Sequence, residues 1–354
     1  MHIDDHEASE PGLLLGERYQ DDGVGVLNLT TRQRAAKADV ASKVRQGTYA
    51  FEQVCCAVCG GCQSTALALK DRCGLYTPVE MCSRCGLIAT NPRMTEASYR
   101  EYYDHEYRIL HDRESTPLQA FARERRRGEE IHRYLHENRA LPAEPRSSFV
   151  VEVGCGAGGI LGAFQSRGYT CCGLDIASAR LEYGRTRHGL DLRAETLVEA
   201  ELPRAPDLVI YSHVLEHVLD VGEELGRLRE VLAPDGTVYI EVPGVKRLDL
   251  VYEHDFLRYL QNAHVHHFSL RTLTNLLEKH GFERVAGDER ARSAFRVSGR
   301  SATGWRSDVD DALAALRVAE QARVRFRWKA SARSVLHRAG LLPLARRAMA
   351  RFGR

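Results

Sequence analysis

The segment Val150–Gly159 reads VVEVGCGAGG and decides the fold of the 354-residue chain. A run of apolar residues typical of a buried strand is followed at once by four glycines within six positions. Where a strand turns into a helix, such glycines let a ligand approach the backbone N–H groups at the N-terminus of the helix. The segment therefore predicts a nucleotide-binding turn at the carboxyl end of a parallel strand.

The sequence around this turn alternates between strand and helix patterns. Strands are expected over 149–153, 169–174, 207–212 and 237–242, and helices over 159–167, 177–188, 221–232 and 270–279. Residues 283–285 and 294–297 are expected to form a hairpin at the sheet edge. This alternation predicts an α/β fold with a doubly wound, mainly parallel sheet.

Two classes of cofactor fit the spacing of the glycines. The spacing that begins at Gly154 satisfies the GxGxxG fingerprint of dinucleotide-binding turns. The spacing that begins at Glu152 also satisfies the acidic-x-GxGxG pattern of enzymes that bind S-adenosylmethionine (SAM). A carboxylate at Glu152 suits a cationic amino acid moiety and opposes a pyrophosphate. Asp175, which ends the second strand, can accept the ribose hydroxyls of either cofactor.

Two later blocks bear on this choice. DLVIYSHVLEH (207–217) and LAPDG (232–236) resemble the fourth-strand and pre-fifth-strand motifs of class I SAM-dependent methyltransferases. The chain resembles this family over residues 147–300. The resemblance implies a Rossmann-like sheet of seven strands and transfer of the methyl group of SAM to an acceptor.

The same resemblance implies roles for individual residues. The glycines of the turn face the methionine and ribose part of SAM, Glu152 lies toward its amino group, and Asp175 contacts the ribose hydroxyls. Ser212 and His213 lie beside the transferred methyl group. The implied cofactor-binding residues are Glu152, Gly154, Cys155, Gly156, Gly158, Asp175, Ile176, Ser212 and His213.

Seven of the ten cysteines lie between residues 53 and 92, and four of them form two CxxCG knuckles, CAVCG (56–60) and CSRCG (82–86). Two residues between thiolates let a tight turn present both sulfurs to one metal ion. Cys56, Cys59, Cys82 and Cys85 are therefore predicted to bind Zn²⁺. Four thiolates fill the tetrahedron, so this zinc is expected to be structural. Metal-free cysteines packed as small apolar residues are the alternative.

A four-cysteine module ahead of a SAM-binding fold resembles the zinc-containing methyltransferases of bacterial sugar and cell-surface polysaccharide pathways. The stretch CGLIATNPR (85–93) and the tyrosine-rich stretch 99–107 also resemble that group. The resemblance implies a sugar or polysaccharide-related acceptor. The sugar C-methyltransferases of the group carry a substantial further domain, whereas a short basic tail follows here, so O-methylation is expected at least as much as C-methylation. Two alternatives are another small-molecule or RNA methyltransferase and a non-catalytic zinc- and nucleotide-binding assembly protein.

Methyl transfer to a hydroxyl or an enolisable carbon needs alignment of donor and acceptor and removal of a proton. Histidine suits this task because its pKa is near neutral. Glu216 and His217 are placed as a base and its orienting partner, and the run HVHH (264–267) begins a segment expected to cap the pocket. The predicted catalytic residues are His213, Glu216, His217 and His264. For each histidine, a structural hydrogen bond at a helix start is the alternative. A second metal is not expected, because no carboxylate lies at matching spacing.

Bulk composition limits the location and partners of the protein. The apolar content of 44%, the charged content of 28% and the net charge of +2 are typical of a globular protein without general affinity for DNA. The start MHIDDHEASE lacks the features of a secretory signal, and no segment approaches the roughly 18–20 apolar residues of a membrane span. We expect a cytoplasmic protein whose cysteines stay reduced.

The sequence predicts five regions: an N-terminal arm (1–50), a zinc-binding domain (51–95), a helical connector (96–145), a SAM-binding domain (146–300) and a basic helical tail (301–354).

The connector and the tail each contain side chains with two possible roles. In the connector, aromatic residues either offer stacking faces for a sugar ring or pack the connector against the core: Tyr102, Tyr103, His105 and Tyr107. The tail, with Trp328, Leu336, Leu341 and Leu342, is expected either to lie on the anionic inner membrane surface or to form a solvated or partner-docking helix.

Overall fold

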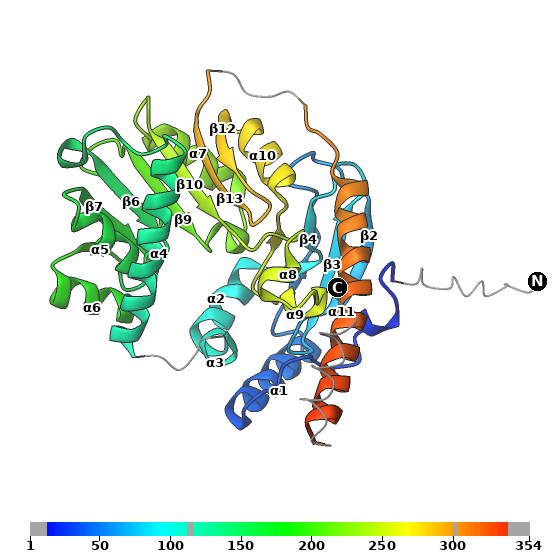
Figure 1. Ribbon diagram of the computed structural model, residues 1–354. Coiled ribbons are helices and arrows are strands. Elements are labelled where there is room, and N and C mark those ends of the chain that lie inside the picture. The colour runs from blue at the N-terminus through cyan, green and yellow to red at the C-terminus, as the bar shows by residue number, and fades with distance from the viewer. Residues whose placement is uncertain (1–12, 112–115, 177, 300–303, 339–354) are drawn as a thin grey trace, which may run out of the picture.

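A seven-stranded sheet forms the centre of the fold (Figure 1). The computed structural model describes residues 13–111, 116–176, 178–299 and 304–338. The strands of this sheet are β6 (Phe149–Val153), β7 (Thr170–Leu174), β8 (Asp191–Arg193), β9 (Leu208–Ser212), β10 (Thr237–Glu241), β12 (Phe282–Gly287) and β13 (Arg292–Val297). Their order is β12-β13-β10-β9-β6-β7-β8. Strands β6 to β10 pair in parallel, and β13 is antiparallel to both β10 and β12. The predicted Rossmann-like, mainly parallel sheet and its edge hairpin are confirmed.

Helices cover both faces of this sheet. One face packs against α4 (Pro117–Glu137), α5 (Gly159–Gln165) and α6 (Ser178–His188), and the other against α7 (Val221–Val231) and α10 (Leu270–Lys279). Neighbouring residues of β6 point to opposite faces, since Val150 packs with the first group of helices and Val151 with the second. A parallel strand that is buried on both sides needs apolar residues at nearly every position, which explains the run FVVEV.

The order of the strands places a ligand crevice beside β6. The chain passes from β6 to β7 and β8 on one side and returns to β9 and β10 on the other, so the order reverses between β6 and β9. Ligands of open α/β sheets bind outside the carboxyl ends of the strands at such a switch point. Gly154, Asp175 and His213 directly follow the carboxyl ends of β6, β7 and β9.

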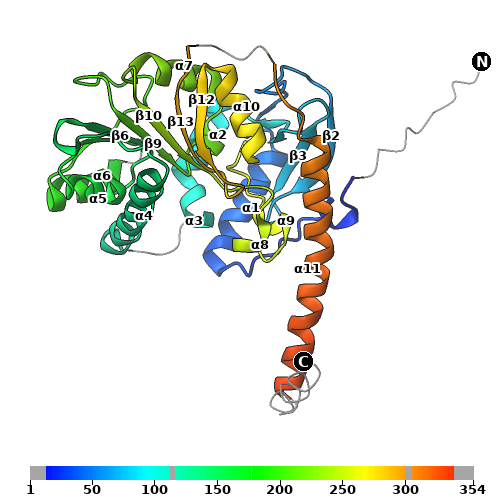
Figure 2. The same cartoon turned by 45° about the horizontal axis from the view of Figure 1, so that its top comes forward.

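A second sheet of four strands lies beside the first (Figures 1 and 2). Its strands are β2 (Ser64–Lys70), β3 (Tyr76–Cys82), β4 (Ile88–Thr90) and β11 (His266–His267), in the order β11-β4-β3-β2 and all antiparallel. A short pair, β1 (Phe51–Glu52) with β5 (Arg93–Met94), accompanies it. His266 and His267 were expected in a segment over the pocket. They instead form the strand that joins the methyltransferase-like part of the chain to the cysteine-rich part.

Eight further helices lie within the described residues. They are η1 (Glu17–Tyr19), α1 (Thr31–Arg45), α2 (Glu96–His105), α3 (Tyr107–His111), η2 (Pro145–Ser147), η3 (Leu215–His217), α8 (Leu248–Val251) and α9 (Phe256–Tyr259). Ser269 caps α10, because its side chain accepts a hydrogen bond from the N–H of Thr272. Helix α4 lies in the region predicted as a connector, but it buries Phe121, Ile131 and Leu135 in the core of the seven-stranded sheet.

The C-terminal helix α11 (Val309–Arg338) packs only its first part on the body of the protein. Ala312, Leu316 and Ala319 are buried against the second sheet and α9, and the remainder of the helix extends away from the body (Figure 2). No helix within the described ranges has the length and hydropathy that a membrane crossing needs. The membrane contact expected for the tail stays a prediction, because the side chains of Trp328 and Leu336 are not described and Leu341 and Leu342 lie outside the described residues.

Candidate functional site

The glycine turn after β6 is built on backbone conformations that disfavour side chains. Gly154, Gly156 and Gly158 have positive φ angles of 70°, 55° and 77°. A Cβ atom on Gly154 would also lie 2.4 Å from Cγ2 of Val214, which follows β9. Glycine is therefore required at this position both by conformation and by the close approach of a neighbouring element.

Three carboxylates surround this turn. Asp175 accepts a hydrogen bond from the N–H of Gly156 (2.8 Å), and Glu124 of α4 accepts one from the N–H of Gly159 (3.2 Å). Glu152 is 2% exposed, and its Oε2 atom has no hydrogen-bond partner. The sequence predicted Asp175 and Glu152 here but not Glu124. Glu124 lies 28 residues before Glu152 in the chain, and no spacing rule connects the two.

The charges of these groups distinguish between the two cofactor classes. Burial raises the pKa of Glu152 well above its usual value, and the nearby carboxylates of Glu124 and Asp175 raise it further. Burial also raises the pKa of Glu124. Carboxylates already accept two N–H groups that a pyrophosphate would need, and a pyrophosphate would add like charge. A cationic ligand would instead relieve the repulsion, so the turn favours SAM over a dinucleotide.

The other predicted cofactor residues line the same edge of the sheet. Cys155 is buried, and a Cβ on Gly173 would lie 2.7 Å from its sulfur, so its side chain packs beneath the turn. Ile176 is 72% exposed directly after Asp175. The Ser212 hydroxyl donates to Oε2 of Glu241 at 3.4 Å. Their contacts with a cofactor stay predictions.

His213 follows β9 in an unusual backbone conformation. Its φ is 60°, and its N–H donates to the carbonyl of Glu241 at 2.7 Å. A non-glycine residue in this region of φ carries strain, which is frequent at functional sites. The Nδ1 atom of His213 lies 3.4 Å from Oε1 of Glu216, and the side chain is 34% exposed. His213 is therefore both oriented by a carboxylate and accessible.

Glu216, His217 and His264 converge next to His213. Each offers one ligand atom to a group whose members all lie within 4.8 Å of one another. Nδ1 of His217 lies 2.9 Å from the carbonyl oxygen of Ala263 and 3.0 Å from the hydroxyl of Tyr103. Burial lowers the pKa of His217 and of His264, which favours the neutral form of both rings. The structure thus brings all four predicted catalytic residues together, and it adds Tyr103.

The aromatic residues of the connector have different environments. Tyr102 is fully buried and His105 is exposed. Tyr103 and Tyr107 are half-buried, and their ring centroids lie 6.3 Å and 6.2 Å from that of His217. Of the four, Tyr103 and Tyr107 are therefore the aromatic side chains beside the predicted catalytic group.

The four predicted zinc ligands form one cluster. The sulfurs of Cys56 and Cys85 are 3.4 Å apart, as are those of Cys59 and Cys82, and all four lie within 4.8 Å of one another. The hydrogen bond between Cys56 and Cys85 lowers the pKa of Cys56 and raises that of Cys85. The donor set and its spacing fit a tetrahedral Zn²⁺ site.

Two further cysteines correct an expectation. Cys55 and Cys62 form a disulfide, although all the cysteines were expected to be reduced. The turn between the first two knuckle cysteines brings Cys55 and Cys62 together, with Cα atoms 4.5 Å apart, which is within bonding reach. Because these two sulfurs bond to each other, the register of the first knuckle is Cys56 and Cys59.

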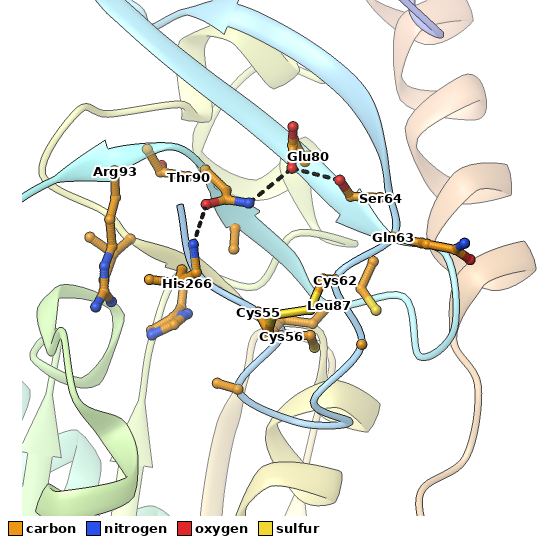
Figure 3. A pocket seen from close by; sticks show the side chains of 17 residues that line it. Cys55, Cys56, Cys62, Gln63, Ser64, Glu80, Leu87, Thr90, Arg93 and His266 are labelled. Atoms are coloured by element: carbon orange, nitrogen blue, oxygen red, sulfur yellow. Dashed lines mark hydrogen bonds between the residues drawn. A yellow bond between two sulfur atoms is a disulfide. The ribbon is translucent and has the colours of Figure 1, made fainter. Parts of the chain in front are cut away.

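A small cavity lies beside the cysteine cluster (Figure 3). Its walls include the disulfide, Glu80, Arg93 and His266, and Glu80 accepts hydrogen bonds from Ser64 (2.6 Å) and Asn91 (3.2 Å). Its volume of about 40 Å³ is room for roughly one water molecule. The cavity is too small for a cofactor or an organic acceptor.

Comparison with known proteins supports this view of the central part of the chain. Residues 121–286 match a family model described as a methyltransferase domain. Ubiquinone biosynthesis O-methyltransferases from Bradyrhizobium sp. (strain ORS 278) and Rhodopseudomonas palustris (strain BisA53) are 34% and 35% identical to this chain over 96 and 97 residues. Each match covers 26% of this chain and 38% of the relative, so the chain spans well under half the length of these relatives.

Solved structures of methyltransferases are similar to part of the chain. A SAM-bound amino pentose methyltransferase from Micromonospora echinaspora is 25% identical with a TM-score of 0.30, covering 37% of this chain and 58% of that one. Human N-acetylserotonin methyltransferase in complex with SAM is 16% identical with a TM-score of 0.43, covering 58% and 62%.

Proposed function

We propose that the chain transfers the methyl group of SAM to a hydroxyl group of a sugar or polysaccharide-related acceptor. The match of residues 121–286 to a family model described as a methyltransferase domain supports this proposal. The observation that carries this proposal is the glycine turn with its three carboxylates. Glu152 is buried and Glu124 is half-buried beside it, and their repulsion is relieved best by a bound cation. SAM carries positive charge at its sulfonium and amino groups.

Deprotonation of the acceptor is assigned to His213. Its Nδ1 faces Glu216, which leaves the Nε2 lone pair for the acceptor hydroxyl. The proton moves to Nε2 of His213, and the acceptor oxygen forms a bond to the methyl carbon of SAM. The carbon–sulfur bond breaks with its electron pair on sulfur, which yields S-adenosylhomocysteine (SAH).

The acceptor class rests on the aromatic residues beside this base. Half-buried Tyr103 and Tyr107 offer ring faces and hydroxyl groups, which suit a sugar ring. Oxygen is preferred over carbon as the acceptor atom because the curated relatives are named O-methyltransferases. Those names also favour a second candidate, a phenolic acceptor like a ubiquinone precursor, for the same base and the same tyrosines.

Zinc is proposed for the four-cysteine cluster. Four thiolates leave no open position, so this ion would support the fold and take no part in the chemistry. Cys82 and Cys85 are buried within the same core cluster as Val151 and Val209 of the large sheet. The metal would therefore stabilise the methyltransferase core directly.

Two measurements test the proposal. Isothermal titration calorimetry should show micromolar binding of SAM and SAH and no binding of NAD⁺. Transfer of a labelled methyl group from SAM should then occur to nucleotide sugars or lipid-linked glycans, and the phenolic alternative predicts transfer to catechols instead. Failure to bind either SAM or SAH would remove the enzymatic proposal altogether.

A further inference from the structure

Glu216 is a buried carboxylate that, among the described residues, has no hydrogen bond to offset its loss of solvent. Its side chain is 1% exposed, and neither of its oxygens makes a hydrogen bond. Among the described residues, its ion-pair contact is Nδ1 of His213 at 3.4 Å, and no lysine or arginine lies within 4.0 Å of it. A buried carboxylate normally has hydrogen bonds, an opposite charge or a metal ion. Glu216 therefore lacks a cationic partner of the kind that its burial requires.

His217 and His264 each place a ring nitrogen within 4.8 Å of a carboxylate oxygen of Glu216. The carbonyl oxygen of Ala263 accepts a hydrogen bond from Nδ1–H of His217, which leaves the lone pair on Nε2. Hydrogen bonding of the second ring nitrogen to a backbone carbonyl is the usual support of a metal-binding histidine. His264 is 6% exposed, its Nδ1 has no hydrogen-bond partner, and its ring centroid lies 4.8 Å from that of His217.

We propose that Glu216, His217 and His264 bind a divalent transition-metal ion, at a site separate from the four-cysteine cluster. Two imidazoles and one carboxylate suit Mn²⁺, Fe²⁺, Co²⁺ or Zn²⁺ and leave coordination positions open, whereas Mg²⁺ and Ca²⁺ prefer oxygen ligands. The sequence did not predict this site because its carboxylate and its third ligand, His264, are separated by 48 positions. The hydrogen bond from the N–H of Val265 to the carbonyl of Glu216 brings them together (2.8 Å).

The location of the site indicates its role, which rests on the proposed function. Half-buried His217 gives access from the side of His213 and Tyr103. A metal ion with open positions would bind an acceptor hydroxyl and lower its pKa. Glu216 has two oxygens, so it can orient His213 with one and bind the ion with the other. The substrate class that fits is an acceptor with two adjacent oxygens, such as a sugar diol or a catechol.

The test counts metal ions in the full-length protein. The wild type, incubated with Co²⁺ or Mn²⁺ and desalted, should carry one ion beyond the cysteine-bound zinc by mass spectrometry of metals. Glu216→Gln and His264→Gln should each lose that ion or bind it at least about 10-fold more weakly, and both should retain zinc. His266→Gln is the matched control, a buried histidine two positions from His264 that lies outside the triad, and it should keep both ions.

Spectroscopy and SAH binding complete the test. Bound Co²⁺ should show ligand-field bands without a thiolate charge-transfer band, which distinguishes this site from the cysteine cluster. A wild-type protein that binds no second ion, or a Glu216→Gln variant that keeps it, overturns the inference even if the other variants fail to fold. SAH binding is measured in parallel: SAH binding without a second ion refutes only the metal site, and a second ion without SAH binding refutes only the proposed methyltransferase.

Discussion

The cysteine cluster and the glycine turn each bring together several groups that can carry negative charge, but the two sites suit different kinds of ligand. In the cluster, four sulfurs from two short motifs face one another within 4.8 Å and match one metal ion. At the turn, three carboxylates from α4, β6 and the end of β7 lie close together, and burial raises the pKa of two of them. The first arrangement fits a ligand that holds the fold together. The second keeps the free protein under electrostatic strain that a cationic ligand relieves, as expected for a reversible binding site.

The largest effect is expected from breaking the cluster. Cys82→Ser removes one thiolate from a buried tetrahedral set, so zinc should be lost and the free energy of unfolding should fall by more than about 4 kcal/mol. Because Cys82 packs with the core of the large sheet, this sheet should unfold in the same transition. Thermal unfolding with metal analysis measures both.

Cys171→Ser is the control for this change. Cys171 is half-buried on β7 and lies outside the cluster, so zinc content should stay the same. Retention of zinc and of thermal stability by Cys82→Ser would show that the two knuckles do not serve one ion.

The next effect is on cofactor affinity. Asp175→Ala removes the acceptor for the N–H of Gly156 and the expected acceptor for the ribose hydroxyls. Hydrogen bonds to charged groups contribute about 1.5–3 kcal/mol each, so the Kd for SAH should rise about 100-fold in calorimetry. Asp191→Ala, at the exposed start of β8, should leave the Kd unchanged. If the two variants bound SAH with equal affinity, the cofactor would not bind at this turn.

Sequence reasoning predicted features within continuous segments and missed contacts between segments that are distant in the chain. The strand over 149–153 and the role of its glycines follow from a continuous segment, and Asp175 follows from its fixed distance to that segment. Glu124 was missed because its approach to the turn depends on the packing of α4 against α5. The pairing of β11 with β4 and the meeting of Glu216 with His264 likewise depend on tertiary contacts between distant segments.

A smaller change tests whether charge or shape matters at Glu124. Glu124→Gln keeps an oxygen for the N–H of Gly159 but removes the carboxylate of Glu124. The Kd for SAM should rise about 10-fold and that for SAH by less, because SAH lacks the sulfonium charge. The thermal stability of the free protein should rise slightly as repulsion is relieved. Glu129→Gln, on the same helix in an ion pair with Arg167, is the control and should leave both affinities unchanged.

The smallest effect is the pH dependence of SAM affinity. The pKa of Glu152 is raised in the free protein, chiefly by burial, and a bound cation should lower it again. Binding then releases a proton, so affinity should rise with pH between the bound-state and the free-state pKa, by less than about 10-fold per pH unit. Calorimetry in buffers of different ionisation enthalpy measures the released protons. Glu152→Gln should abolish this release while the titration of the SAM amino group persists in both proteins, so the difference between them isolates Glu152. Equal proton release from both proteins would mean that the buried carboxylate does not respond to the cation, and the contrast with the cysteine cluster would then rest on Glu124 and Asp175 alone.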